Sequence, residues 1–185
     1  MTLKNTTTTW GSIAKLLHWA GAVLVIYLIG DGWWMTHMVA RSGRFAAYGQ
    51  HALVGYYVLL LMALRIVWRL LNPTPALPAD SLPWERIAAR ASHATLYILT
   101  FGLSLTGWLM AGVGRRPPEA TLFGFFQVPL AYRTPDRALH DILEDTHRVL
   151  AYALLALIIV HVGGALRHHF HKKNDVLRRM GWAGQ

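Results

Sequence analysis

Cysteine is absent from the 185-residue chain, and acidic residues are scarce. Without cysteine the chain cannot form disulfides, thiolate-held zinc sites or iron–sulfur clusters. Any metal must therefore be held by histidine or carboxylate side chains. The nine acidic residues leave a net charge of +9, and only 15% of residues are charged while 54% are hydrophobic. This composition is too apolar for an ordinary soluble domain.

Charged residues are also missing from four long stretches. Residues 16–30, 45–64, 91–114 and 149–166 contain no Asp, Glu, Lys or Arg. A helix needs about 20 mostly apolar residues to cross a membrane. We therefore predict four transmembrane helices, at about residues 11–35, 46–70, 87–113 and 138–170. The predicted fold class is an all-α membrane protein, a four-transmembrane-helix bundle that residues 1–185 form as one domain.

The first apolar stretch is interpreted as a retained span. It follows the polar segment MTLKNTTTTW and ends in Gly-Asp-Gly-Trp-Trp, which lacks the small-residue cleavage site of a signal peptide. The positive charge does not indicate nucleic-acid binding, which needs basic residues on a water-facing surface. Here they cluster at span ends, where Lys and Arg meet headgroups. The expected partner is membrane lipid, not nucleic acid.

The charge distribution predicts the orientation of the spans. One side of the four predicted helices holds eleven of the eighteen basic residues and three of the nine acidic residues, and the other side holds the remaining seven and six. Under the positive-inside rule, both termini and the connection between the second and third helices are cytoplasmic. We expect a multi-pass protein of the bacterial inner membrane.

Two connections have distinctive compositions. Residues 72–83 are rich in proline, which predicts an extended connection without a helix. The outer connection, residues 115–135, contains an aromatic patch, FGFF. Because aromatic rings prefer the membrane interface, we expect this segment to form a cap there.

Five of the ten histidines, His18, His51, His93, His147 and His161, lie within or at the ends of the predicted spans. A single histidine in a span is most often a packed or headgroup-facing residue, but spacing favours a different interpretation for two of them. His147 and His161 are fourteen residues apart, so they share a helix face within about 40° and lie roughly 21 Å apart. This spacing leaves room for two stacked macrocycles.

Depth in the membrane supplies each of these histidines with a partner. His18, near the inner start of the first helix, matches His161, and His51, near the outer start of the second, matches His147. Six-coordinate haem takes two axial ligands, so the predicted pairs are His18/His161 and His51/His147. His93 lies at the inner depth and is an alternative to His18.

The glycines near these histidines give weaker support. Gly21 and Gly55 lie on the faces of His18 and His51, where a flat porphyrin needs a helix without a side chain. Glycine is equally common where membrane helices pack closely. His168, His169 and His171 are interpreted as part of a basic tail at the headgroups, and His37 and His140 as outer-loop residues that bind nothing.

Together these residues resemble the prokaryotic cytochrome b561 family along nearly the whole chain. The motifs that carry the resemblance are His18-Trp19, His51 with Gly55, Arg65 with Trp68-Arg69, the NPTP turn, Ser92-His93 with Leu96-Tyr97, Phe-Gly-Phe, His147 with His161, and HHFHKKNDVLRRM. The resemblance implies two b-type haems, ligated by His18, His51, His147 and His161. It also implies electron transfer between ubiquinone and an outer donor, and one branch of the family resembles a superoxide oxidase.

An outer surface that attracts superoxide should be positive. The candidate steering residues are Arg41, Arg44, Arg115, Arg116, Arg133, Arg137 and Arg148, although six outer acids dilute their field. Near the inner side, Lys15, His93 and His168 are candidates for a quinone site, which needs hydrogen-bond donors or proton acceptors at headgroup depth. The inner basic cluster is expected to favour a reduced haem there.

Two alternatives remain open at this point. The protein could be an electron-carrier subunit that docks a periplasmic redox partner through the FGFF patch and has no substrate reaction of its own. It could also be a haem-free transporter with a histidine relay, although such transporters usually place acids within their spans and the four uncharged runs contain none.

Overall fold

The computed structural model describes residues 2–115 and 120–181 of the chain. Its elements, in chain order, are α1 (Ser12–His37), α2 (Arg44–Leu71), α3 (Pro83–Val113), β1 (Thr121–Leu122), β2 (Phe126–Gln127), α4 (Arg137–Leu166), the π-helical turn η1 (Arg167–His171) and α5 (Val176–Met180). The turn η1 continues α4 without a break, so α4 and η1 together form one rod of 35 residues.

Four of these elements, α1, α2, α3 and the α4–η1 rod, are long and apolar enough to cross a membrane. The shortest, α1, has 26 residues, which at about 1.5 Å per residue exceeds the roughly 30 Å hydrocarbon layer. Large apolar side chains are exposed along all four. Such exposure would be a liability in water, whereas in a bilayer these side chains contact lipid. The prediction of an all-α membrane bundle with four long helices is confirmed.

Local hydrogen bonds explain where two of the long helices begin. At α3, the carboxylate of Glu85 accepts a hydrogen bond from the Leu82 N–H at 2.9 Å, and Pro83 occupies the first turn. At α4, the Asp136 side chain accepts from the Leu139 N–H at 3.0 Å. Both contacts satisfy N–H groups at the helix start. The cap at Glu85 moves the start of α3 four residues ahead of the predicted position.

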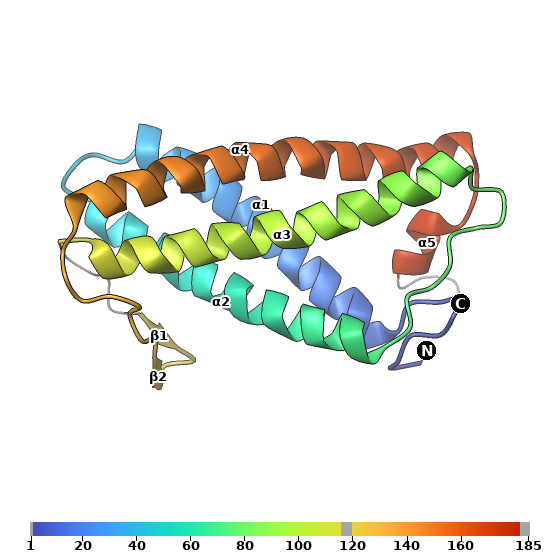
Figure 1. Cartoon of the computed structure of the whole chain (residues 1–185), viewed down its shortest axis with the longest axis horizontal. Coiled ribbons are helices and arrows are strands. Elements are labelled where there is room, and N and C mark those ends of the chain that lie inside the picture. Colours follow the sequence, from blue (N-terminus) through green and yellow to red (C-terminus); the bar gives the residue numbers. More distant parts are fainter. Residues whose placement is uncertain (1, 116–119, 182–185) are drawn as a thin grey trace.

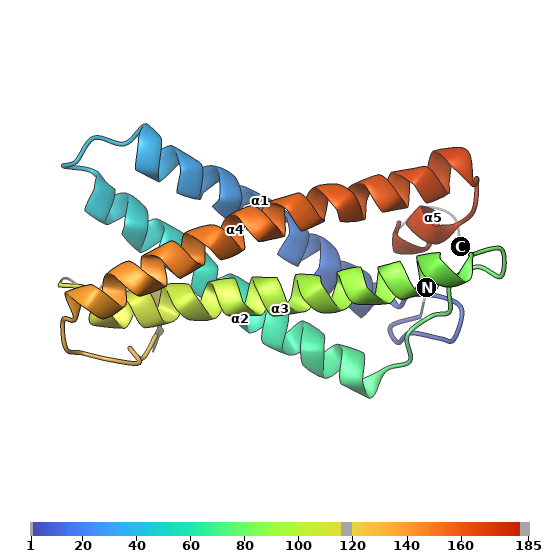
Figure 2. The same ribbon diagram turned by 45° about the horizontal axis from the view of Figure 1, so that its top comes forward.

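The helices form two pairs that cross each other. Helix α1 packs against α2 and α3 packs against α4, while α2 also contacts α3; the two pairs cross in an X (Figure 1 and Figure 2). Segments 2–11, 72–82 and 167–181 gather at one end of the bundle, which we call the tail end. Segments 38–43 and 120–136 lie at the opposite end, the hairpin end.

Several details differ from the sequence-based expectations. His37 is the last residue of α1 and His140 lies in the first turn of α4, so neither is a loop residue. Helix α1 continues past the first uncharged run, which places Asp31 inside a spanning helix. The four uncharged runs contain no acid, but acids occur in the helices that include these runs, in α3 and α4 as well as in α1, so the absence of acids does not hold for whole spanning helices. The helix α5 and the short hairpin β1–β2 were not expected.

Candidate metal centres

Two pairs of histidine rings face each other across the bundle, one pair toward each end. At the hairpin end, the ring centres of His51 on α2 and His147 on α4 are 6.3 Å apart. At the tail end, those of His18 on α1 and His161 on α4 are 6.4 Å apart. The structure thus brings together both pairs that depth in the membrane predicted, while their role as ligands stays a prediction.

The ring separation is what one metal ion between two imidazoles requires. A metal–imidazole nitrogen bond is about 2.0–2.1 Å, and a ring centre lies roughly 1 Å behind its nitrogen, so two opposed imidazoles on one ion have centres about 6 Å apart. Direct packing would bring the rings closer, as for His93 and His161, whose centres are 5.4 Å apart. The ring spacing of both predicted pairs fits a bis-histidine metal centre.

Each histidine at the hairpin end is held by a hydrogen-bond acceptor on a neighbouring helix. The Nδ1–H of His51 donates to the carboxylate of Asp31 at 2.9 Å. The Nδ1 of His147 lies 3.0 Å from the hydroxyl of Thr106. That hydroxyl donates its own proton to the Leu103 carbonyl at 2.9 Å, so it accepts from His147. Both rings therefore carry their proton on Nδ1 and keep Nε2 unprotonated for a metal.

A glycine follows each of these acceptors. A Cβ built on Gly32 would lie 3.5 Å from Cε1 of His51, and one on Gly107 would lie 3.3 Å from Cε1 of His147. Each hairpin-end histidine thus lies close to the glycine that follows its hydrogen-bond acceptor, Asp31-Gly32 on α1 or Thr106-Gly107 on α3. This arrangement fixes both the tautomer and the position of the rings.

The tail-end pair has positively charged neighbours. Arg65 on α2 donates from Nη2 to Nδ1 of His18 at 2.9 Å. The guanidinium groups of Arg65 and Arg69 both lie over the ring of Tyr97, at 5.1 and 5.5 Å from its centre, a distance suited to cation–π attraction. Neither arginine forms an ion pair within residues 2–115 and 120–181. They are cations available to an anionic group of a bound cofactor.

The glycines on the histidine faces border open space. Gly21 is buried, yet a Cβ added there would meet no atom within 4 Å. Gly55, one turn after His51, likewise has no atom near that position. A buried glycine beside empty space is what a flat macrocycle next to His18 requires, so the residues present fit a haem.

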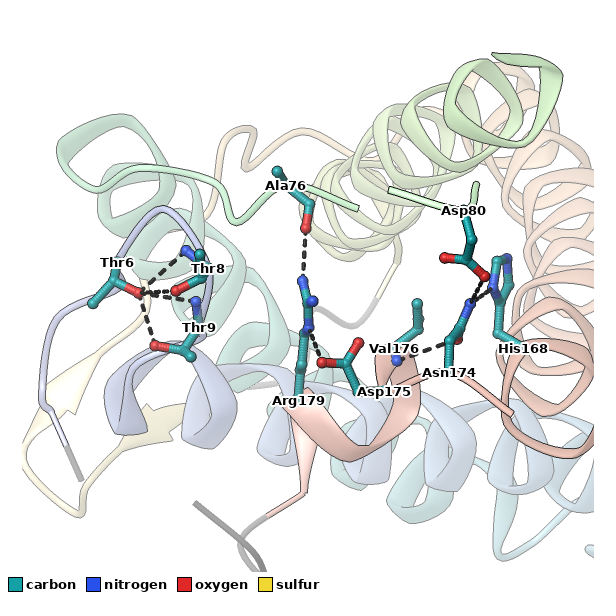
Figure 3. A network of polar contacts seen from close by, with 10 residues as sticks. All are labelled: Thr6, Thr8, Thr9, Ala76, Asp80, His168, Asn174, Asp175, Val176 and Arg179. Carbon is teal, nitrogen blue, oxygen red and sulfur yellow. Dashed lines mark hydrogen bonds and ion pairs between the residues drawn. The ribbon is translucent and has the colours of Figure 1, made fainter. Parts of the chain in front are cut away.

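The quinone candidates lie at the tail end but have different partners. Lys15 is only 2% exposed, and its Nζ donates to the Gly181 carbonyl at 2.8 Å. His93 packs against the ring of His161. His168 accepts at Nδ1 from Asn174, whose amide also reaches toward Asp80 (Figure 3). The hydrogen bond from Asn174 leaves Nε2–H of His168 available as a donor.

The candidate steering arginines differ in how far their charge is neutralised. Arg137 lies 3.7 Å from Asp141, and Arg148 donates to Asp145 at 2.7 Å. Arg44 donates to the carbonyls of Val39 and Thr36. Three of the remaining candidates are exposed and form no ion pair with a described residue: Arg41, Arg115 and Arg133. The last candidate, Arg116, lies outside the described residues.

Sequence reasoning missed the acceptors of the hairpin-end pair, Asp31 and Thr106. The signal for Asp31 was present, because an acid within reach of a spanning helix is expected to face the bundle and pair with another group. The Asp-Gly and Thr-Gly dipeptides were also visible. Pairing them with His51 and His147 required the rotation of α1 and α3 about their axes, which periodicity does not give.

The fold and the site together define a class, membrane-spanning four-helix proteins with a pair of facing histidines toward each end. The family model for prokaryotic cytochrome b561 matches residues 9–183, and the chain belongs to that family. Its members bind b-type haem, so the protein is a multi-pass membrane cytochrome of b type.

Curated relatives agree with this assignment. The chain is 34% identical to cytochrome b561 homolog 2 of Escherichia coli (strain K12), over 97% of this chain and 95% of that protein. It is 28% identical to cytochrome b561 homolog 1 of the same organism, over 89% and 92%. A probable superoxide oxidase CybB of Yersinia pestis is 30% identical over 70% of this chain and 72% of its own length.

Proposed function

We propose that this cytochrome holds two b haems, one between His18 and His161 and one between His51 and His147, and carries electrons from an outer donor, superoxide, to ubiquinone. The observation that carries the proposal is the pair of ring separations, 6.4 and 6.3 Å, at opposite ends of the bundle. A bound haem supplies one-electron oxidation and reduction of its iron. The histidines hold and orient it, and the helices exclude water.

The overall reaction balances in electrons and protons. Two superoxide ions each lose one electron and become dioxygen, and one ubiquinone takes both electrons with two protons and becomes quinol. The hairpin end faces the donor and the tail end faces the quinone. Lys15, His93 and His168 are the tail-end groups that can donate hydrogen bonds to a quinone or pass protons to it.

Superoxide as the donor is supported by two observations. One relative bears the name probable superoxide oxidase. In addition, the exposed guanidinium groups of Arg41, Arg115 and Arg133, which form no ion pair with a described residue, place positive charge at the hairpin end, which attracts a small anion. Arg137 and Arg148 contribute less, because Asp141 and Asp145 neutralise them.

We place the protein in the bacterial inner membrane with the tail end in the cytoplasm. Basic residues are concentrated at that end, among them Arg86, Arg90, Lys173 and Arg178, as the positive-inside rule requires of a cytoplasmic surface. A reporter enzyme that works only in the cytoplasm should therefore be active when it is fused to either terminus.

The first test is an absorption spectrum of the detergent-purified protein, oxidised and then reduced with dithionite, with a pyridine haemochrome assay. Two low-spin b haems per chain are expected, and a protein without haem would contradict the proposal. The second test follows superoxide consumption with and without a short-chain ubiquinone. Faster consumption that depends on quinone is expected, and the control is the His51→Ala variant, which we expect to retain only the tail-end haem.

A second candidate function is supported by the hairpin. Phe123, Phe125 and Phe126 are exposed on it, Phe125 by 81%, and the rings of Phe123 and Phe125 stack with centres 6.1 Å apart. Such a patch suits the docking of a periplasmic redox protein, in which case the cytochrome is an electron-carrier subunit. Superoxide consumption no faster than in the His51→Ala control would favour this function.

A further inference from the structure

The carboxylate of Asp31 is the one acid that contacts a candidate haem ligand within residues 2–115 and 120–181. It lies in the sixth turn of α1 and accepts a hydrogen bond from His51 at 2.9 Å. The side chains of Asp31 and His51 are only 9% and 18% exposed. Placing an acid in a spanning helix is costly, so the contact calls for a functional reason.

We propose that Asp31 is a positioning residue that orients His51 and lowers the reduction potential of the hairpin-end haem below that of the tail-end haem. The inference rests on the proposed function, since it needs a haem at each pair. A histidine ligand that donates its free N–H to a carboxylate becomes a stronger electron donor to the metal. A stronger donor stabilises the oxidised iron and lowers the potential.

Among the residues that the structure describes, no acidic side chain contacts the other three candidate ligands. The partner of His147 is the neutral hydroxyl of Thr106. At the tail end, Arg65 lies 2.9 Å from His18, and a positive charge beside a ligand stabilises the reduced iron. His161 packs against the rings of His18 and His93. Negative charge at one pair and positive charge at the other make electron flow from the hairpin end to the tail end favourable.

The close approach of α1 supports the role of Asp31 in orientation. A Cβ on Gly32 would lie in van der Waals contact with the His51 ring, so the backbone of α1 comes close enough for the short Asp31 side chain to reach Nδ1. The contact leaves Nε2 as the only nitrogen of His51 that can bind iron. Asp31 thus determines both which nitrogen binds and how strongly it donates.

The test is a potentiometric titration of both haems in the purified wild-type protein and in Asp31→Asn, with haem content and electron paramagnetic resonance spectra measured on the same samples. Asparagine keeps the shape and an acceptor oxygen but removes the charge. We expect the hairpin-end potential to rise and the tail-end potential to stay constant. A tenfold change in how the two haems share an electron corresponds to about 59 mV, and we expect at least that shift.

The matched control is Thr106→Val, which removes a neutral acceptor from the other ligand of the same haem. Its shift should be clearly smaller than that of Asp31→Asn, and Asp31→Glu should restore a low potential. If Asp31→Asn loses the hairpin-end haem while Thr106→Val keeps it, the orienting role is supported. Two retained haems with unchanged potentials, or equal potential shifts in both variants, would overturn the inference about Asp31 but not the proposed function. A wild-type protein without haem would overturn the proposed function as well.

Discussion

The two histidine pairs have the same geometry but opposite surroundings. Their ring separations differ by only 0.1 Å. At the hairpin end the free ring nitrogens meet acceptors, Asp31 and Thr106, whereas at the tail end His18 meets a donor, Arg65. The comparison teaches that the two pairs share a ring spacing that fits a metal ion, while the neighbouring charges distinguish one pair from the other.

The two ends of the bundle also differ in the ion pairs that their helices form. At the tail end, Glu85 is 3% exposed and binds Arg167 at 2.6 Å and Lys172 at 2.5 Å, which ties the start of α3 to η1 and the segment after it. The hairpin end has ion pairs within α4, such as Arg148 with Asp145, and both partners are exposed. We infer that ion pairing holds the tail end together and only adjusts surface charge at the hairpin end.

The largest expected effect comes from removing one ligand at each end. His51→Ala and His161→Ala should each lower the haem content from two to one per chain, because a single imidazole leaves one axial position empty. The double variant should contain none. Pyridine haemochrome analysis of purified protein gives the count directly.

Comparing His18→Ala with His93→Ala then decides the tail-end partner of His161. We expect His18→Ala to lose a haem and His93→Ala to retain both, because the closer rings of His93 and His161 leave too little space for an ion. The reverse result would make His93 the ligand.

A somewhat smaller effect is expected at the glycines. Gly21→Leu should fill the open space beside His18 and reduce occupancy at the tail end only, while Gly55→Leu should do so at the hairpin end only. Reduced haem content with normal expression is the expected result. Gly30→Leu is the control, because Gly30 is exposed on α1 and a side chain there also meets no atom. In a haem-free protein, Gly21→Leu would instead fill a cavity and raise the melting temperature.

Much of this arrangement follows from the sequence, for identifiable reasons. Uncharged runs near 20 residues predict the spans because the bilayer dictates their length. The fourteen-residue spacing of His147 and His161 places both rings on one face because the helix repeat is fixed. Depth then selects their partners, since alternating topology determines which helix ends meet. The structure brings these rings together as the argument requires.

The remaining features depend on contacts that no local pattern encodes. Whether Asp31 meets His51 depends on the rotation of α1 and its crossing angle with α2. The same holds for Thr106 and His147 across α3 and α4. Helix α5 has five residues, too few for a periodic signal. The hairpin turns at Phe123, a non-glycine residue with φ of 55°, so only the adjacent Gly124 marked a turn.

The ion pairs of the buried Glu85 carboxylate provide an intermediate effect on stability. Glu85→Gln removes the one carboxylate that faces both Arg167 and Lys172, leaving two cations without their partner at the tail end. We expect a clear drop in melting temperature, because the largely covered Lys172, 15% exposed, loses the carboxylate that compensates its charge. Tryptophan fluorescence during heating in detergent measures it.

The hairpin end provides the matched control for this variant. Asp145→Asn breaks an ion pair whose side chains are both exposed, and such pairs contribute about 0–1 kcal/mol. Its melting temperature should stay close to that of the wild-type protein. Equal decreases in melting temperature in the two variants would show that ion pairs contribute equally to stability at the two ends.

The smallest expected effect concerns the approach of superoxide. Neutralising Arg41, Arg115 and Arg133 together should slow superoxide consumption by about two- to tenfold at low salt, and the difference should shrink near 0.1 M salt, where the Debye length is about 10 Å. Asp145→Asn should act in the opposite direction, because it frees the charge of Arg148. Stopped-flow rates at several ionic strengths test both signs. If removing these four charges leaves the rates unchanged, electrons enter through a protein docked at the exposed hairpin phenylalanines.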